Sequence, residues 1–382
     1  MFNLHDVMLL LTAALAVLLA LPMALRRQRR MADVVLAGFI LTQGLAALYY
    51  VFLFSPALGG STMAALRTFS WMPIVVFYTL QGPLLLWYSR AITGEGAILC
   101  KRDVRIVLGV LGFAIFQATA VEIAQPGIYA RVPEIYIPWV LSGLSLMALI
   151  LSVVYGYQAV GALRAHSQRI RDQHSNIDDI DLLWLKYTAI GFTAIWSLRV
   201  FAFFGPKLGL KASADFLGTL ANFPTILLVC WMVTLGLSQR QYAGGAPRPE
   251  SEPEADSERS RSPNPALVDK LEQLMDEVRV YQDPDLDVEG LADSVGISPR
   301  SLSALINGHY GVNFYDFVNS YRVSEAKRLL QDPDAKDMTI QRVFETAGFS
   351  SKSTFNTFFK KMTGTTPSEF RRLAGRERAV AT

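Results

Sequence analysis

The sequence predicts an all-α protein with two parts, a seven-helix transmembrane bundle and a cytoplasmic all-helical domain with two helix-turn-helix units joined by a linker helix. Three observations predict this class. Long apolar segments recur through the first 237 residues, charged residues become frequent only after about residue 238, and one helical pattern occurs twice near the C-terminus. The 382 residues suffice for two or three domains, and 51% apolar with 18% charged residues is unusual for one soluble globule.

The apolar segments have the length of membrane spans. A helix needs about 20 mostly apolar residues to cross the hydrocarbon core of a bilayer. The first segment has no basic region before it and is followed by "RRQRR", so we interpret it as a retained span and not as a secretory signal peptide. Residues 1–237 are therefore predicted to form a transmembrane sensor domain, with spans at 7–25, 34–54, 69–89, 104–121, 135–158, 182–204 and 214–237.

The basic residues between the spans predict the orientation. Loops on the cytoplasmic side of a membrane carry an excess of Lys and Arg. The loops after the first, third and fifth spans are rich in these residues, whereas the opposite loops hold only Arg67, Arg131, Lys207 and Lys211. The N-terminus is therefore expected outside, and an odd number of spans places everything after residue 237 in the cytoplasm.

Five polar residues in or near the spans are candidates for lining a ligand cavity. Amide and charged groups are costly in hydrocarbon, so they tend to face protein or water. The alternative is structural, because amides often join membrane helices and an arginine can extend to the headgroups. Three of the candidates lie inside spans and two lie near the outer face: Gln43, Gln81 and Asn222, and Glu122 and Arg199.

No catalytic, metal or cofactor site is expected. The two cysteines, Cys100 and Cys230, are far apart and lie in or beside apolar segments, which argues against a disulfide scaffold or a thiolate metal site. The four histidines lie in separate segments, and no HExxH, GxSxG or phosphate-loop spacing occurs. The sequence therefore gives no support to an enzyme.

A connector is predicted between the two parts. Residues 238–265 include "APRPESEPEADSERSRSPNP", which has no apolar periodicity and is rich in Pro, Ser and Glu. This composition is typical of disordered, solvated chain. A flexible segment of this length has a root-mean-square reach of about 30 Å.

Residues 266–376 contain the repeated pattern. One apolar face with i, i+3, i+4, i+7 spacing is formed by Val288, Leu291, Ala292 and Val295, and it recurs 52 positions later in Ile340, Val343, Phe344 and Ala347. Each face ends in glycine, an apolar residue and serine, as "VGIS" and "AGFS". The glycine can adopt the positive φ of a turn and the serine can cap the next helix, so each copy predicts a helix-turn-helix.

The helices after the two turns match at an offset of 53. Their inward positions are Leu302, Leu305 and Ile306 in the first unit and Phe355, Phe358 and Phe359 in the second. The exposed stripe of the first unit is Arg300, Ser303 and Asn307, and that of the second is Lys352, Ser353, Asn356 and Lys360. Ser298 before Pro299 predicts an N-cap, and "TPSE" at 366–369 predicts a capping box. Between the units, residues 314–330 predict a linker helix about 25 Å long, which could place two recognition helices about one DNA turn apart.

The charge distribution favours DNA binding over the alternative of a merely solvated helical bundle. Residues 269–293 are acidic, whereas basic residues predominate from Lys352 onward. This asymmetry suits contact between the second unit and phosphate groups.

The segment "GFSSKSTFNTFFKKMTGTTPSEFR" resembles the second helix-turn-helix signature of AraC/XylS-type transcription regulators, and "LADSVGISPRSLSALIN" and "YRVSEAKRLL" are similar to the first unit and linker helix of that family. The resemblance covers roughly residues 270–374. It implies a DNA-binding regulator, more often an activator than a repressor. The base-contacting positions of the family fall on Arg300, Ser303, Ala304, Lys352, Ser353, Asn356 and Thr357.

The chain departs from the family in two respects. Ala304 and Thr357 stand where a long polar side chain is common, and seven spans replace the usual soluble, dimerising N-terminal domain. We therefore expect a regulator in the bacterial inner membrane that couples a membrane or extracytoplasmic signal to transcription. Its expected partners are double-stranded DNA, the lipid bilayer, an unidentified small-molecule or membrane signal, a second copy in a homodimer, and RNA polymerase if it activates.

Two other classes of function stay open from the sequence. One is a transporter or membrane enzyme whose cytoplasmic domain is regulatory, which would need buried, paired ionisable groups in mid-span. The other is a DNA-binding regulator that the bundle merely anchors. Residues 377–382 are interpreted as a short tail.

Overall fold

The part of the chain that the computed structural model describes consists of helices and the loops between them, with an isolated β-bridge between His174 and Asp287. The chain divides into two compact units. Unit 1 comprises Met1–Ala165 and Leu182–Pro247, and unit 2 comprises His166–Asp181 and Arg248–Thr382. The described residues are 4–25, 30–55, 72–94, 98–123, 136–177, 181–205, 209–210, 217, 220, 223–238, 265–335 and 337–381.

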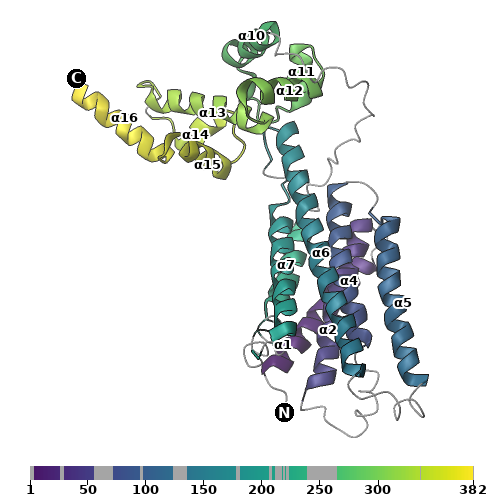
Figure 1. The fold of residues 1–382 in the computed structure, drawn as a ribbon. Coiled ribbons are helices and arrows are strands. Elements are labelled where there is room, and N and C mark those ends of the chain that lie inside the picture. Colours follow the sequence, from purple (N-terminus) through teal and green to yellow (C-terminus); the bar gives the residue numbers. More distant parts are fainter. Residues whose placement is uncertain are drawn as a thin grey trace. The chain divides into compact units, whose positions relative to one another are not determined.

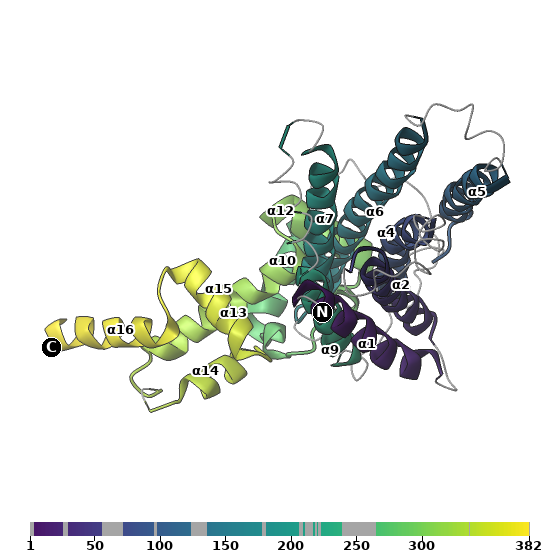
Figure 2. The same cartoon turned by 90° about the horizontal axis from the view of Figure 1, so that it is seen from below.

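In the described part of unit 1, a helix lies at each of the seven predicted spans (Figure 1, with α9 labelled in Figure 2). Among the described residues, four helical segments are long and apolar enough to cross a membrane: Leu4–Ala24, Met31–Phe52, Leu146–Gln173 and Leu183–Phe204. Membrane crossing stays a prediction for all seven spans, and these four satisfy its requirements of length and composition. The helices are α1 Leu4–Ala24, α2 Met31–Phe54, α4 Met72–Thr93, α5 Lys101–Ile123, α6 Tyr136–Gln173, α7 Leu183–Phe204 and α9 Phe223–Ser238.

Helix α6 differs from its prediction. The predicted span ends at residue 158, whereas the helix continues to Gln173. Loss of hydropathy marks where a span leaves the bilayer and not where a helix ends, and the basic residues Arg164, Arg169 and Arg171 are good helix formers. The last eight residues of α6 therefore extend into unit 2.

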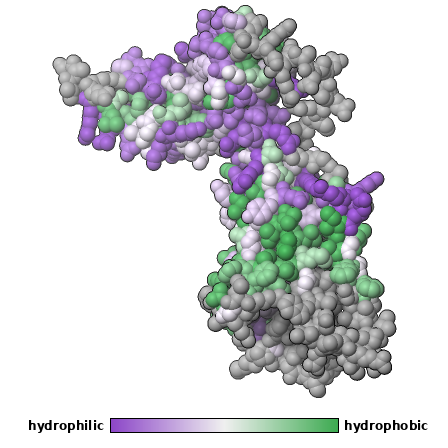
Figure 3. All heavy atoms as spheres, in the orientation of Figure 1, coloured by the Kyte–Doolittle hydropathy of each residue, from purple (hydrophilic) through white to green (hydrophobic). Residues whose placement is uncertain are grey.

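The outer surface of the bundle is apolar. Large apolar side chains are at least two-fifths exposed on several of its helices, including Leu18 of α1, Leu108 of α5 and Leu227 of α9. Figure 3 shows a mostly hydrophobic surface over the described part of the bundle that faces the viewer and a more hydrophilic surface over unit 2. Exposed apolar surface of this extent is unusual on a soluble monomer and is what contact with lipid requires.

Inside the bundle, consecutive helices α1, α2, α4 and α5 pack as neighbours (Figure 2). Helices α4 and α6 approach closely at Gly82, where an added Cβ would lie 2.7 Å from Cα of Ser152. At the same crossing, the Ser152 hydroxyl donates to the Tyr78 carbonyl oxygen at 2.8 Å. Small residues and a side-chain hydrogen bond at a helix crossing are typical of membrane helix packing.

A buried ion pair lies where α4 ends and α5 begins. Arg90 Nη1 lies 2.6 Å from Asp103 Oδ2, and the Asp103 side chain is 1% exposed. The Tyr155 hydroxyl of α6 donates to the other carboxylate oxygen at 3.4 Å. The pair therefore joins three helices at one end of the bundle, the end predicted to be cytoplasmic.

Unit 2 contains the predicted domain, and its linker helix is confirmed as helical. Two apolar clusters form around the two helix-turn-helix units, and α13 contributes to both, with Phe317 and Val318 in the first and Val323 and Ala326 in the second. The predicted connector lies outside the described residues, apart from its two ends. The helices are α10 Pro265–Gln273, a π-helical turn Leu274–Val278, a 3₁₀ turn Val280–Gln282, α11 Val288–Val295, α12 Pro299–Tyr310, α13 Phe314–Gln331, α14 Ile340–Thr346, α15 Lys352–Thr363 and α16 Pro367–Ala381.

Candidate nucleic-acid interface and membrane recess

The first turn has the expected geometry. Helix α11 ends at Gly296, whose φ of 84° places it in the left-handed region. The Ser298 side chain then accepts a hydrogen bond from the Ser301 amide at 3.1 Å, and Pro299 occupies the first helical position of α12. Glycine, N-cap and proline together end one helix and begin the next within three residues.

In the second turn, the serine that caps the next helix lies one residue later than the repeated pattern predicts. Gly348 has a φ of 93°, as the pattern predicts. The residue that caps α15 is Ser351 and not Ser350 of "AGFS", because the second turn is one residue longer; the Ser351 hydroxyl accepts from the Thr354 amide at 3.4 Å.

The capping box of α16 is present. The Thr366 amide donates to Glu369 Oε2 at 3.0 Å, and the Glu369 amide donates to Thr366 Oγ1 at 3.3 Å. The bonds to the carboxylate lower the pKa of Glu369.

The predicted inward and outward faces are observed in both recognition helices. Leu302, Leu305 and Ile306 of α12 are buried, as are Phe355, Phe358 and Phe359 of α15. Among the predicted DNA-contacting residues, only Ser303 is half-buried. The exposed ones are Arg300, Ala304 and Asn307 on α12, and Lys352, Ser353, Asn356, Thr357 and Lys360 on α15.

Two side chains of α15, Lys361 and Thr357, already interact with other residues of unit 2. Lys361 Nζ lies 3.6 Å from Asp316 Oδ1 of α13, so this lysine contributes less positive charge to the stripe than Lys360 does. The Thr357 hydroxyl donates to the Ser353 carbonyl oxygen at 2.9 Å, so it can contact a base or phosphate only as an acceptor without breaking that bond.

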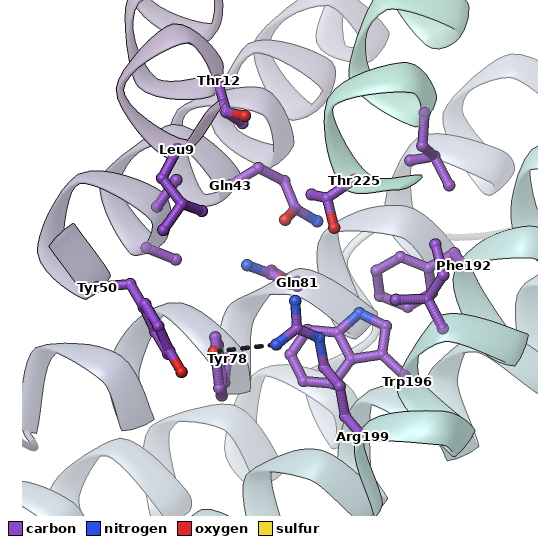
Figure 4. A pocket seen from close by; sticks show the side chains of 14 residues that line it. Leu9, Thr12, Gln43, Tyr50, Tyr78, Gln81, Phe192, Trp196, Arg199 and Thr225 are labelled. Carbon is purple, nitrogen blue, oxygen red and sulfur yellow. Dashed lines mark hydrogen bonds between the residues drawn. The ribbon is translucent and has the colours of Figure 1, made fainter. Parts of the chain in front are cut away.

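Unit 1 contains a recess among α1, α2, α4, α7 and α9 (Figure 4). Three of the five predicted ligand-lining residues, Gln43, Gln81 and Arg199, lie on its wall. Asn222 lies outside the described residues, and Glu122 lies on α5, where its side chain is not described. The recess is also lined by Tyr50, Tyr78 and Trp196, which were not predicted because aromatic residues are common in membrane helices.

The polar groups of the recess surround one positive charge. Arg199 Nη1 lies 3.5 Å from the Tyr78 hydroxyl, and its guanidinium carbon lies 5.6 Å from the ring centre of Trp196. Gln81 is 1% exposed, and its Oε1 atom has no hydrogen-bond donor among the residues that the structure describes. A buried amide oxygen without a donor is costly, so the recess is suited to a group that can donate to it.

The recess is narrow. Its cavity volume is about 40 Å³. One water needs roughly 10 to 15 Å³ of cavity volume. The enclosed part therefore fits a few waters or a small headgroup, and a larger ligand would leave most of its length outside.

Comparisons with known proteins agree on the C-terminal part. Residues 291–373 match the family described as "Helix-turn-helix domain". The chain is 33% identical over 119 residues to HTH-type transcriptional regulator GlxA of Rhizobium meliloti (strain 1021), covering 31% of this chain and 35% of the relative. It is 37% identical over 98 residues to the arabinose operon regulatory protein of Escherichia coli (strain K12), covering 26% of this chain and 32% of the relative. No solved structure matches.

The fold and the matches define a class for this part of the chain. It is a helix-turn-helix domain similar to those of AraC-type transcription regulators, and a domain of this class implies binding to DNA. The chain spans about a third of the length of these two relatives. The residues that match the family lie within unit 2.

Proposed function

We propose that the protein is a membrane-bound, sequence-specific transcription regulator in which the bundle detects a signal and unit 2 reads DNA. The observation that carries this proposal is the presence of two capped helix-turn-helix units with exposed polar stripes on a chain that also contains long apolar helices. The similarity to transcription regulators supports a regulator over an enzyme. The proposed location is the bacterial inner membrane, with the N-terminus outside and unit 2 in the cytoplasm.

The stripes assign a role to each recognition helix. Arg300 on α12 can donate two hydrogen bonds to O6 and N7 of guanine, and Asn356 on α15 can pair with N6 and N7 of adenine. Lys352 and Lys360 serve mainly as phosphate contacts, which fix the register without reading sequence. Ala304 presents only a methyl group, which suits contact with the methyl group of thymine.

Substitutions on the two stripes should weaken DNA binding in different ways. Arg300→Ala should cost about 1 to 3 kcal/mol on the specific site and relax sequence preference at one base pair. Lys360→Ala should weaken binding to specific and random DNA alike and reduce the slope of log K against log salt by about 1. Titrations of the full-length protein with both DNAs at several salt concentrations measure these effects. Equal losses on both DNAs for both variants would contradict the assignment.

Genome-wide mapping of bound DNA tests the function itself. The full-length protein should recover discrete sites that share a bipartite sequence, and the double variant Arg300→Ala with Asn356→Ala should lose them. Recovery of no discrete site by the parent protein would reject a sequence-specific regulator and favour the transporter or membrane-enzyme class. The buried Arg90 and Asp103 pair gives that class little support, because it lies at helix ends.

The recess is the proposed sensory site. Its lining residues include one cation, two amides and several aromatic rings. Arg199 can bind an anionic headgroup, and Gln81 Oε1 can accept from a donor on that headgroup or from a water that accompanies it. A monoanionic amphiphile, with its headgroup in the narrow part and its tail toward lipid, fits this chemistry and volume.

Neutralising the recess should abolish selectivity for an anion. In lipid nanodiscs, decanoate should bind the parent protein more tightly than decanol does. Arg199→Gln should weaken decanoate binding about tenfold or more, because a charged hydrogen bond contributes about 1.5 to 3 kcal/mol. Tryptophan fluorescence can follow binding, since Trp196 lines the recess. Arg105→Gln removes the same charge from an exposed position and is the matched control. Equal affinity of the parent for both probes would contradict an anion site.

A further inference from the structure

A short segment that links α6 and α7 of the bundle is part of unit 2. The segment is His166–Asp181, which begins with the last turns of α6. Ile170 and Ile177 are buried in the apolar cluster of the second helix-turn-helix unit, together with Tyr315, Val323 and Ala326 of α13. The guanidinium of Arg171 lies 6.0 Å from the ring centre of Tyr315. The segment therefore contributes to the core of the DNA-binding domain.

Hydrogen bonds fix the same segment at Ser175. Its backbone carbonyl accepts from Arg322 Nη1 and from Asn319 Nδ2, each at 3.2 Å, and its hydroxyl oxygen accepts from Arg322 Nη2 at 3.0 Å. The Ser175 amide and hydroxyl both donate to the Leu286 carbonyl oxygen. Bonds of this number on a buried serine define one register for the segment, because a shift of a single residue would break all of them.

Arg322 connects this contact to both helix-turn-helix units. It is 1% exposed and also donates to the carbonyl oxygens of Tyr281 and Asp283, each at 2.7 Å. The Tyr281–Asp287 stretch leads directly into the first unit, since Asp287 is the N-cap of α11. Arg322 itself lies on α13, which packs in both apolar clusters. One side chain thus contacts the docked segment, the entry to the first unit and the helix shared by both.

We infer that His166–Asp181 is the contact through which the bundle controls the DNA-binding domain, so that the signal reaches unit 2 along α6 and not through residues 239–264. Helix α6 is continuous from Tyr136 to Gln173, so a rotation or shift of its membrane part is carried to Ile170. The recess has a direct link to α6, because the Tyr78 carbonyl oxygen accepts from Ser152 while the Tyr78 ring lies beside Arg199.

The geometry also indicates what the contact controls. The exposed residues of α12 and α15 stay accessible while the segment is docked, so docking does not cover the DNA-reading surface. Docking of the segment fixes α13 and the Tyr281–Asp287 stretch. These two elements hold the two helix-turn-helix units at their mutual distance. A bipartite DNA site requires that distance to match the helical repeat of DNA. The bundle therefore controls the distance between the two helix-turn-helix units and not the exposure of their DNA-reading residues. This inference rests on the proposed regulatory function.

The test compares three changes in the full-length protein in membranes. Ile177→Asp places a charge in the apolar cluster and should undock the segment. Gln168→Asp introduces the same side chain at an exposed position of the same segment and is the matched control. The third change inserts ten Gly and Ser residues into the connector at 246–265. Output is read from a promoter found by mapping, and docking is read by hydrogen exchange of the peptide that contains Tyr281–Asp287.

Ile177→Asp should speed exchange in that peptide and change basal promoter output at least fivefold, with affinity in vitro for random DNA within about threefold of the parent, because phosphate contacts do not require a fixed spacing. The control and the insertion should each change output less than twofold. Unchanged output despite faster exchange would overturn the inference, as would an insertion that alters output as much as Ile177→Asp does. Loss of binding to random DNA as well by Ile177→Asp would also overturn it, by making the segment only a structural part of the domain. Absence of mapped sites for the parent protein would instead reject the proposed function.

Discussion

Replacing Gly348 with alanine should destabilise the second helix-turn-helix unit by about 2 to 5 kcal/mol. Two costs add at this position. A φ of 93° is unfavourable for any residue with a Cβ, at about 1 to 2 kcal/mol. The new Cβ would also overlap the Tyr281 carbonyl oxygen and lie 2.8 Å from Cα of Gln282, and relieving such overpacking costs about 1 to 3 kcal/mol more. The turn must therefore open or separate from the Tyr281 stretch.

Gly311→Ala separates the two costs. Gly311 ends α12 with a φ of 69°, but no described atom lies within 4 Å of the position that an added Cβ would occupy, so only the backbone cost of about 1 to 2 kcal/mol should appear. Hydrogen exchange measures the opening free energy in the full-length protein, in peptides from α14 and α15 for Gly348→Ala and in peptides from α11 and α12 for Gly311→Ala. Tryptophan fluorescence cannot, because residues 248–382 contain no tryptophan. Equal losses for the two variants would show that the contact with Tyr281 and Gln282 carries no energy.

The domain that contains Gly348 was predictable because its signals are local. Three signals lie within about ten residues of one another. The apolar spacing indicates a buried helical face, the glycine indicates a turn, and the serine indicates the start of the next helix. The same reasoning misplaced the second cap by one residue, at Ser350 where the structure has Ser351. Two adjacent serines satisfy the local pattern equally well, and only the length of the turn decides between them.

The docked segment was not predictable in this way. Its contacts join Ser175 to Arg322, residues 147 positions apart, and no periodic pattern relates them. Arg322 lies in a helix whose sequence allows an exposed arginine, and Arg164 and Arg171 suggested a cytoplasmic loop. The signal that could have indicated the contact is the pair Ile170 and Ile177, two apolar residues in an otherwise polar stretch.

The recess was predictable only in part. Polar residues in apolar helices are conspicuous, so Gln43, Gln81 and Arg199 could be chosen from the sequence as candidates. Their convergence on one recess depends on how α2, α4 and α7 pack, which helix periodicity does not determine. The aromatic rings beside Arg199 gave no separate signal, because the same residues are common wherever a membrane helix meets the headgroups.

Arg322→Met should cost about 3 to 5 kcal/mol in the stability of unit 2. Burial lowers the pKa of Arg322 to about 10, so the side chain is still charged at neutral pH and its donors are fully used. Methionine fills much of the same volume, which leaves the loss of donors as the main effect. The carbonyl oxygens of Tyr281, Asp283 and Ser175 would lose bonds from a charged donor in a buried site, and removal of one partner from such a network typically costs about 3 to 5 kcal/mol.

Arg322→Lys should recover only part of this loss, because one ammonium lacks the planar fork that reaches oxygens on two segments at once. Lys327→Met on the same helix removes an exposed cation and should change stability by less than about 0.5 kcal/mol. Hydrogen exchange of the peptides around Ser175 and Tyr281 measures all three variants. Both peptides should exchange faster together in Arg322→Met, since one guanidinium holds them. If only the Tyr281 peptide responds, the bonds to Ser175 contribute nothing and apolar contacts alone hold the segment.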